Sequence, residues 1–163
     1  MAEFTWEYPN ENHSDYLLRA GDRPVGSLQF APQSTGQFEG VTWTFERVSI
    51  PHPAINVKVP GSREVFAHFL PGVAGQGVVT FAGGRRYRWT RVHPWSNEWC
   101  FRSDAGRSAV CVSQNAGALA GGAKVTVCSK ESELPETPIL ILLAWHLRLL
   151  EFEHLSESIV LCG

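Results

Sequence analysis

An apolar segment near the C-terminus reads Pro138-Ile-Leu-Ile-Leu-Leu-Ala-Trp-His-Leu-Arg-Leu-Leu-Glu-Phe152. Every side chain from Ile139 to Trp145 is apolar, and a helix that is apolar all round must be surrounded by lipid or by protein. The uninterrupted run is far shorter than the roughly 20 residues that span a bilayer. Protein is therefore the predicted surround. Thr137 can cap the helix and Pro138 suits its first position, so we expect a central helix over about residues 137–152, about 22 Å long.

The chain before this segment is a succession of short strand-like runs separated by turn residues. Such runs extend over about residues 15–129, and they amount to about nine to twelve antiparallel strands. A sandwich closes its own core, whereas a barrel of ten or more strands has a lumen that must be filled. The sequence therefore predicts one mainly β domain over residues 1–163, a closed barrel of about 12 strands around the central helix. Residues 153–163 are expected to form a C-terminal tail or a last strand.

Composition and cysteine usage limit the class of protein. The 163 residues are 44% hydrophobic and carry a net charge of −2, which argues against a nucleic-acid partner. The first residues have neither a basic region nor an apolar core, so we expect no secretory signal and a cytoplasmic protein with reduced thiols. Cys100 and Cys111 flank a turn within residues 103–107. A two-residue loop would place them opposite one another, a three-residue loop with a bulge would place them on opposite faces, and both remain open.

Five groups of residues carry a resemblance to a known family. They are Gly77-Val-Val-Thr-Phe81, then Gly-Gly-Arg-Arg-Tyr-Arg-Trp89, then Trp99-Cys-Phe-Arg-Ser-Asp-Ala-Gly106, then Leu134-Pro-Glu, then Leu142-Leu-Ala-Trp-His-Leu147. In this order they resemble bacterial members of the tubby C-terminal-like group, which includes LURP-one-related proteins and phospholipid scramblases. The resemblance implies about twelve strands closed around a buried C-terminal helix. Neither the phosphoinositide pocket of tubby proteins nor the calcium-binding stretch of scramblases maps onto residues of this chain.

Candidate site residues come from one basic cluster and one histidine. Alternation along a strand places Arg86 and Arg88 on one face and Tyr87 and Trp89 on the other. The basic side chains are interpreted first as a solvated outer face and second as an anion site for a lipid headgroup or phosphate. His146 follows Trp145 on the predicted helix, and a backbone hydrogen bond near the barrel mouth outweighs a ligand role. The candidate residues are Arg85, Arg86, Arg88, Arg91 and His146.

No catalytic, phosphate-loop or metal-ligand motif stands out from the sequence, so no cofactor and no metal are expected. The predicted function is that of a non-enzymatic binding module, associated with anionic lipid or a membrane surface and without a transmembrane span. The alternatives are a small-molecule binder or enzyme at the barrel mouth, and a structural domain that binds a protein partner. Trp95 is either an exposed loop anchor or a cap over a barrel end.

Overall fold

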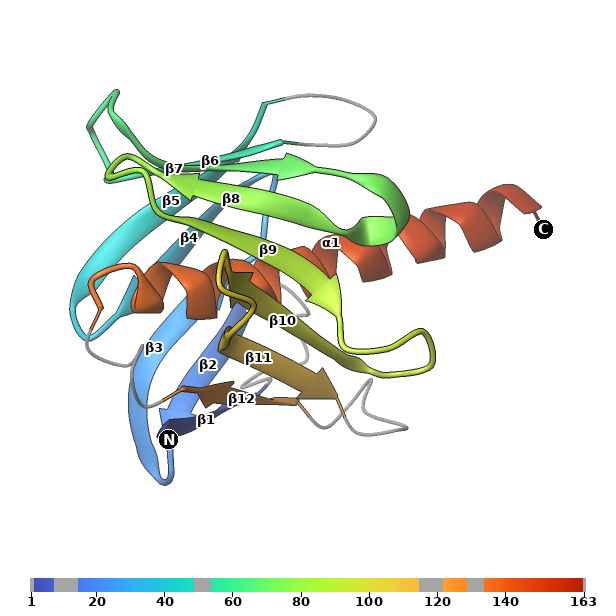
Figure 1. Cartoon of the computed structure of the whole chain (residues 1–163), viewed down its shortest axis with the longest axis horizontal. Coiled ribbons are helices and arrows are strands. Elements are labelled where there is room, and N and C mark those ends of the chain that lie inside the picture. The colour runs from blue at the N-terminus through green and yellow to red at the C-terminus, as the bar shows by residue number, and fades with distance from the viewer. Residues whose placement is uncertain (1, 8–14, 49–53, 115–121, 129–133, 163) are drawn as a thin grey trace.

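A computed structural model describes residues 2–7, 15–48, 54–114, 122–128 and 134–162, and side chains in the helix as far as Glu153. Twelve antiparallel strands form one closed barrel, and a single helix runs through it (Figure 1). The barrel and its central helix confirm the predicted fold. The elements are β1 (Ala2–Glu7), β2 (Asp15–Ala20), β3 (Arg23–Gln29), β4 (Gln33–Phe38), β5 (Val41–Arg47), β6 (Ile55–Lys58), β7 (Val65–Pro71), a 3-10 turn (Val73–Gly75), β8 (Gly77–Phe81), β9 (Arg86–Arg91), β10 (Glu98–Ser103), β11 (Ser108–Gln114), β12 (Ala123–Val127) and α1 (Thr137–Cys162).

Each strand pairs with its neighbour in sequence, and β1 closes the ring by pairing with β12 as well as with β2. The prediction that strands begin near residue 15 is therefore wrong, because Ala2–Glu7 supplies the closing strand. Its inward Trp6 is fully buried. Closure pairs the backbone groups of both outermost strands, so the sheet has no open edge.

Strand β4, with the residues Gln-Ser-Thr-Gly-Gln-Phe, was not predicted from the sequence. Its inward positions are small: Ser34 is fully buried, and Gly36 faces the helix. A Cβ on Gly36 would lie 3.0 Å from Leu142 Cδ1 and 2.9 Å from Phe45 Cε2. The strand lacks apolar alternation because the helix occupies the space that larger side chains would fill.

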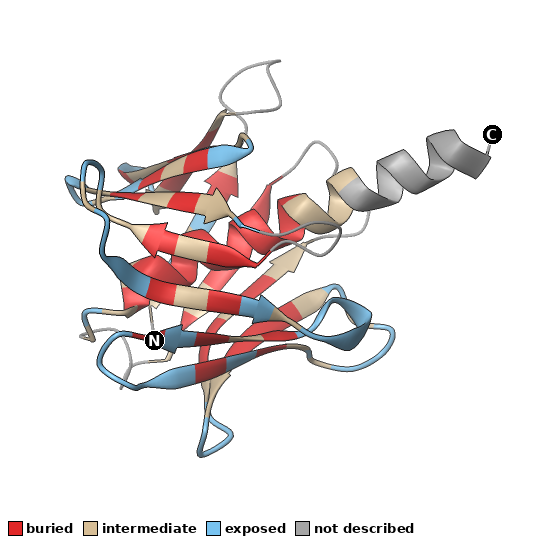
Figure 2. Ribbon diagram, turned by 90° about the horizontal axis from the view of Figure 1, so that it is seen from above, coloured by how far each residue is buried: buried red, intermediate tan, exposed pale blue. Residues whose placement is uncertain are grey.

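The strands turn alternate side chains into the lumen, as the burial pattern in Figure 2 shows. Tyr87 and Trp89 point inward, which confirms the predicted alternation of β9, and Trp99 and Phe101 of β10 point the same way. Trp89 stacks on Trp99 with ring centroids 5.5 Å apart, and it also contacts Phe101. Seven aromatic and aliphatic side chains from five strands are buried together: Phe45, Val57, Phe81, Tyr87, Trp89, Trp99 and Phe101.

Helix α1 fills the lumen with side chains on every side. All residues from Ile139 to Leu149 are buried, including the two polar ones. Trp145 stacks on Trp6 and meets Tyr16 edge-on, so the helix is held by rings from β1 and β2. The helix then continues to Cys162, beyond the strands (Figure 1). The expected end near residue 152, with a tail or strand after it, is wrong, because no proline or glycine interrupts residues 153–162.

The β10–β11 hairpin resolves the two cysteine alternatives. Ser103 and Arg107 close a three-residue loop, and a register shift between Phe101 and Arg102 then restores direct pairing of Cys100 with Cys111. The two cysteines are joined by a disulfide on the outer face of the barrel. The expectation of reduced thiols is therefore wrong for this pair, because the shifted register brings the two side chains to the same face.

Shortening a helix side chain in the lumen tests how much the filling contributes to stability. Leu143 is fully buried, so Leu143→Ala should lower the free energy of unfolding by about 2–5 kcal/mol through lost burial and a residual cavity. Urea denaturation followed by far-UV circular dichroism measures this loss. Leu150→Ala, at a partly buried position packed against the edge of the core, is the matched control and should cost less. Equal losses for the two variants would contradict the central role of the lumen segment.

Candidate functional site

Strand β9 carries the arginines that the sequence singled out. Arg86 and Arg88 are exposed on the outer face, whereas Tyr87 and Trp89 are buried inside, as predicted. Arg85 lies in the turn before β9 and pairs with Glu136 at 3.1 Å, where the chain enters α1. Arg86 lies 3.7 Å from Asp104 of the β10–β11 turn, and both side chains are more than half exposed. These contacts leave Arg86 only weakly compensated, because solvent screens such a pair.

Arg102 joins this group through the sheet register. It lies directly opposite Arg88 on β10, so two guanidinium-bearing side chains share one position of the outer face. Within the described part of the chain, neither side chain has an ion-pair or hydrogen-bond partner. Like charges in directly opposed cross-strand positions destabilise a sheet. Arg102 was missed from the sequence, although the parity that turns Trp99 and Phe101 inward also turns Arg102 outward.

An apolar surface continues the same row on the other side of Arg88. Val78 of β8 pairs with Arg88, and Leu70 of β7 pairs with Val78. Leu70 is 60% exposed, and Phe66, four residues earlier on the same strand, is 44% exposed. The outward alternation of β7 therefore places bulky apolar groups beside the unpaired arginines.

The loops of these strands add two apolar tips at the end of the barrel where α1 leaves the lumen, called here the exit end (Figure 1). Val73, between β7 and β8, is 82% exposed, and Trp95, between β9 and β10, is 89% exposed. Trp95 is thus an exposed loop residue and does not cap the barrel. The outer side of β7–β10 with these two loops is called the basic–apolar face; its members are Phe66, Leu70, Val73, Val78, Arg86, Arg88, Trp95 and Arg102.

Arg91 lies apart from the other predicted arginines, at the exit end of β9. Its guanidinium carbon is 5.1 Å from the ring centroid of Trp99, and its Nη2 is 3.8 Å from Glu151 of α1. Arg148 of α1 also stacks on Trp99, pairs with Glu151 and donates to Gln114 of β11. Burial lowers the pKa of Arg148, an effect that Glu151 opposes and Arg91 reinforces. Arg91 therefore helps to hold the helix and is not part of the basic–apolar face.

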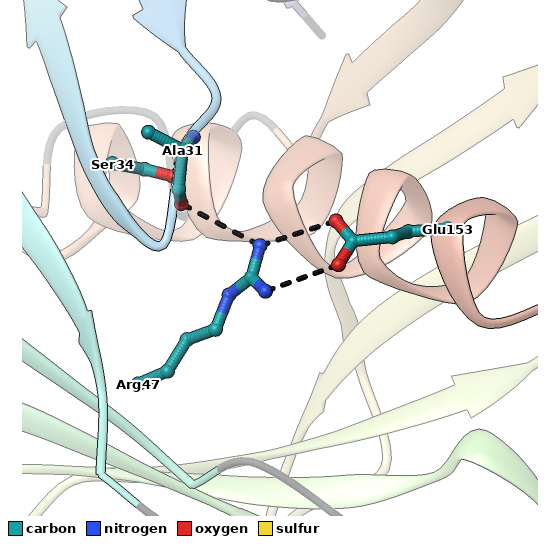
Figure 3. Close-up of polar contacts among 4 residues, drawn as sticks. All are labelled: Ala31, Ser34, Arg47 and Glu153. Carbon is teal, nitrogen blue, oxygen red and sulfur yellow. Dashed lines mark hydrogen bonds and ion pairs between the residues drawn. The ribbon is translucent and has the colours of Figure 1, made fainter. Parts of the chain in front are cut away.

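A second ion pair fixes α1 at the opposite side of the exit end (Figure 3). Arg47, at the end of β5, donates to both carboxylate oxygens of Glu153 at 3.2 and 3.3 Å and to the Ala31 carbonyl at 3.5 Å. The Ser34 hydroxyl donates to the same carbonyl at 2.8 Å and accepts from the Ala31 N–H group. These contacts tie the helix to the β3–β4 loop as it leaves the lumen.

His146 is enclosed within the barrel and does not meet the arginine cluster. It is fully buried between the rings of Phe45 and Phe30, with centroid distances of 5.6 and 5.4 Å. Neither ring nitrogen has a hydrogen-bond partner among the described residues, so the expected backbone hydrogen bond is wrong. Burial, aided by the nearby positive charge of Arg47, lowers the pKa of His146 to about 3. The imidazole is therefore neutral at physiological pH, inside an aromatic cage.

Two shallow hollows, of about 600 and 450 Å³, lie on β2–β4, away from all five predicted site residues. Their lining mixes polar and apolar residues, among them Leu17, Ser27 and Gln37. No helix in the described part of the chain has the length and apolarity that a membrane span requires. His13 and His52 lie outside the described residues, as does the side chain of His154.

Comparison with protein-family models, curated proteins and solved structures found no match for the chain. The candidate site is thus defined by its own residues. It is a row of arginines flanked by exposed apolar side chains on one side of a closed barrel.

The Arg88–Arg102 pair leads to a prediction about stability. Arg88→Glu replaces a like-charge cross-strand pair by an opposite-charge pair, so its melting temperature should rise by up to about 4 °C. Differential scanning calorimetry at low salt measures the shift, and added salt should reduce it. Arg88→Gln should give a smaller rise. A melting temperature that falls in both variants would show that the two side chains do not repel one another.

His146 predicts a specific loss of stability in acid. Its pKa is 6.5 when unfolded and about 3 when folded, so between these values the unfolded state binds the additional proton. Stability should therefore be complete above pH 6.5 and fall with pH by up to about 1.4 kcal/mol per unit until about pH 3. His146→Met removes this contribution, and urea denaturation across the pH range compares the slopes. Parallel curves for variant and wild type would contradict the assignment.

Proposed function

We propose that the chain is a non-enzymatic binding module that attaches peripherally to membranes containing anionic lipid, through the basic–apolar face. The observation that carries this proposal is the unpaired Arg88–Arg102 row with Leu70 and Val78 in direct continuation. Lipid phosphates accept hydrogen bonds from guanidinium groups, and exposed apolar side chains enter the boundary of the acyl chains. A membrane surface offers both chemistries within one plane.

The exposed loop tips support the same orientation. Trp95 projects from the loop between β9 and β10, which carry the arginines, and Val73 projects from the neighbouring β7–β8 loop. Tryptophan is favoured at the interface between headgroups and acyl chains. Since no described helix could span a membrane, the attachment proposed is peripheral. We place the protein on the cytoplasmic side, where anionic lipids concentrate.

The proposed kinship with the tubby C-terminal-like group rests on the residues quoted from the sequence. The closed barrel of twelve strands around a C-terminal helix agrees with what that resemblance implies. We do not extend the proposal to scrambling or to a calcium site, because no residue of this chain matches those functions.

Vesicle cosedimentation tests the proposal. The protein should bind vesicles of phosphatidylcholine with phosphatidylserine at low salt, bind pure phosphatidylcholine vesicles weakly, and be released as salt increases. Arg88→Ala combined with Arg102→Ala should weaken binding about 25-fold, from about 1 kcal/mol for each arginine near the surface. Leu70→Ser and Trp95→Ser should also weaken it. Arg23→Ala is the matched control, since Arg23 is exposed on β3 at the opposite side of the barrel.

The outcomes separate a membrane from other partners. Equal binding to neutral and anionic vesicles, or equal loss in Arg23→Ala, would overturn the lipid proposal. Loss in the arginine variant with full binding by the Leu70 and Trp95 variants would instead indicate contact with the headgroup phosphates alone, without insertion of apolar side chains.

A protein partner is the second candidate, favoured by the exposure of Phe66 and Leu70. It would be indicated if vesicles fail to bind at all and the wild-type chain, unlike Leu70→Ser, self-associates in analytical ultracentrifugation.

A further inference from the structure

We propose that reduction of the Cys100–Cys111 disulfide creates a binding site for a thiophilic divalent cation such as Zn²⁺, with Glu98 as the third protein ligand. The two sulfurs and a Glu98 carboxylate oxygen all lie within 4.8 Å of one another. Among the described residues, this is the one such group of metal-ligating side chains. The proposal does not rest on lipid binding by the basic–apolar face.

The sheet geometry brings these three side chains to one place. Cys100 and Cys111 are direct cross-strand partners on β10 and β11. Glu98 lies two residues before Cys100, so the strand alternation gives it the same outward face. The Cys100 sulfur is 3.8 Å from the Glu98 Oε1 atom. The ligands are therefore held on two paired strands of a closed barrel and need no loop to assemble them.

The spacing suits a tetrahedral ion after a small adjustment of rotamers. Zn²⁺ binds thiolate at about 2.3 Å and carboxylate oxygen at about 2.0–2.2 Å, so neighbouring ligand atoms are separated by about 3.5–3.8 Å. Two thiolates and one carboxylate also match the preference of Zn²⁺ for sulfur with nitrogen or oxygen ligands. The fourth position would face solvent beside Cys111 and Glu98, which are only half-buried.

The disulfide makes the site dependent on redox state. Reduction by a phosphine breaks the sulfur–sulfur bond and gives two thiols, while the phosphine takes oxygen from water and becomes a phosphine oxide. Binding of the cation then displaces the two thiol protons. In the oxidised chain the two sulfurs are bonded to each other and are not thiolates. The cation and the disulfide are therefore alternative states of the same two strands.

Two arginines lie beside the cysteine pair on the outer face of the sheet. Arg102 lies two residues after Cys100 on the same face, and Arg88 lies opposite Arg102. The unpaired Arg88–Arg102 row thus borders the cysteine pair on the side opposite Glu98.

The test compares the full chain before and after reduction with a phosphine, using Zn²⁺ in equilibrium dialysis and Cd²⁺ for the thiolate-to-metal absorption band. The reduced wild type should bind one Zn²⁺ and show the band, whereas the oxidised wild type should show neither. Cys100→Ser and Cys111→Ser should abolish binding, and Glu98→Gln should weaken it at least about tenfold. Cys128→Ser is the matched control, since Cys128 is a free cysteine outside the group, and it should bind as wild type.

Binding by the oxidised chain, retention of binding in Cys100→Ser, or loss in Cys128→Ser would overturn the proposal. The comparison of redox states needs no substitution, so it remains decisive if a serine variant fails to fold. A reduced wild-type chain that loses its near-UV circular dichroism and binds no Zn²⁺ would also contradict the proposal, because the paired strands would then not hold the ligands.

Discussion

The structure depends on the need to cover an apolar helix on every side. A helix with one polar face can lie on a sheet, but the segment from Ile139 to Trp145 offers no face to water. The strands therefore enclose it completely, and their inward side chains are sized to match. Bulky rings from β1, β9 and β10 pack into the lumen, and the small residues Ser34 and Gly36 line β4, where a Cβ on Gly36 would lie 3.0 Å from Leu142 Cδ1. The size of the barrel and the composition of its strands both follow from the enclosed helix.

Enclosure also explains which polar groups are available for function. His146 and Arg148 lie on the buried part of α1. The first is neutral in an aromatic cage, and the second is compensated by Glu151 and Gln114. Arg47 and Arg91 tether the helix where it leaves the lumen. The charged groups that remain available for contact with a partner lie on the outer face. There Arg88 and Arg102 oppose each other without a counter-ion in the described chain.

The elements that could be predicted are those whose apolar pattern shows directly which side chains are buried. The helix had an apolar run with a start signal, and the inward rings of β9 and β10 followed a period of two. The end of α1 was not predictable from its apolar part, because the helix continues to Cys162, beyond the strands. Strand β4 was not predicted because its inward residues are small and give no apolar alternation. Strand β1 was not predicted because its role depends on long-range pairing with β12. Arg86 and Arg88 were placed correctly on the outer face. The position of Arg102 opposite Arg88 follows only from the pairing of β9 with β10. The pairing of Cys100 with Cys111 follows only from the register shift in the β10–β11 hairpin.

The order of elements along the chain has a consequence for how the protein is made. The helix that fills the lumen follows all twelve strands, and β1 must wait for β12 before the ring can close. When only the strands have left the ribosome, the helix that occupies the lumen has not yet been made. Contacts between residues so far apart in the sequence form slowly. Until they form, the exposed strand edges can pair with other chains and aggregate. The barrel of the nascent chain therefore remains open until α1 has emerged, so the strands cannot complete their fold before the helix is made.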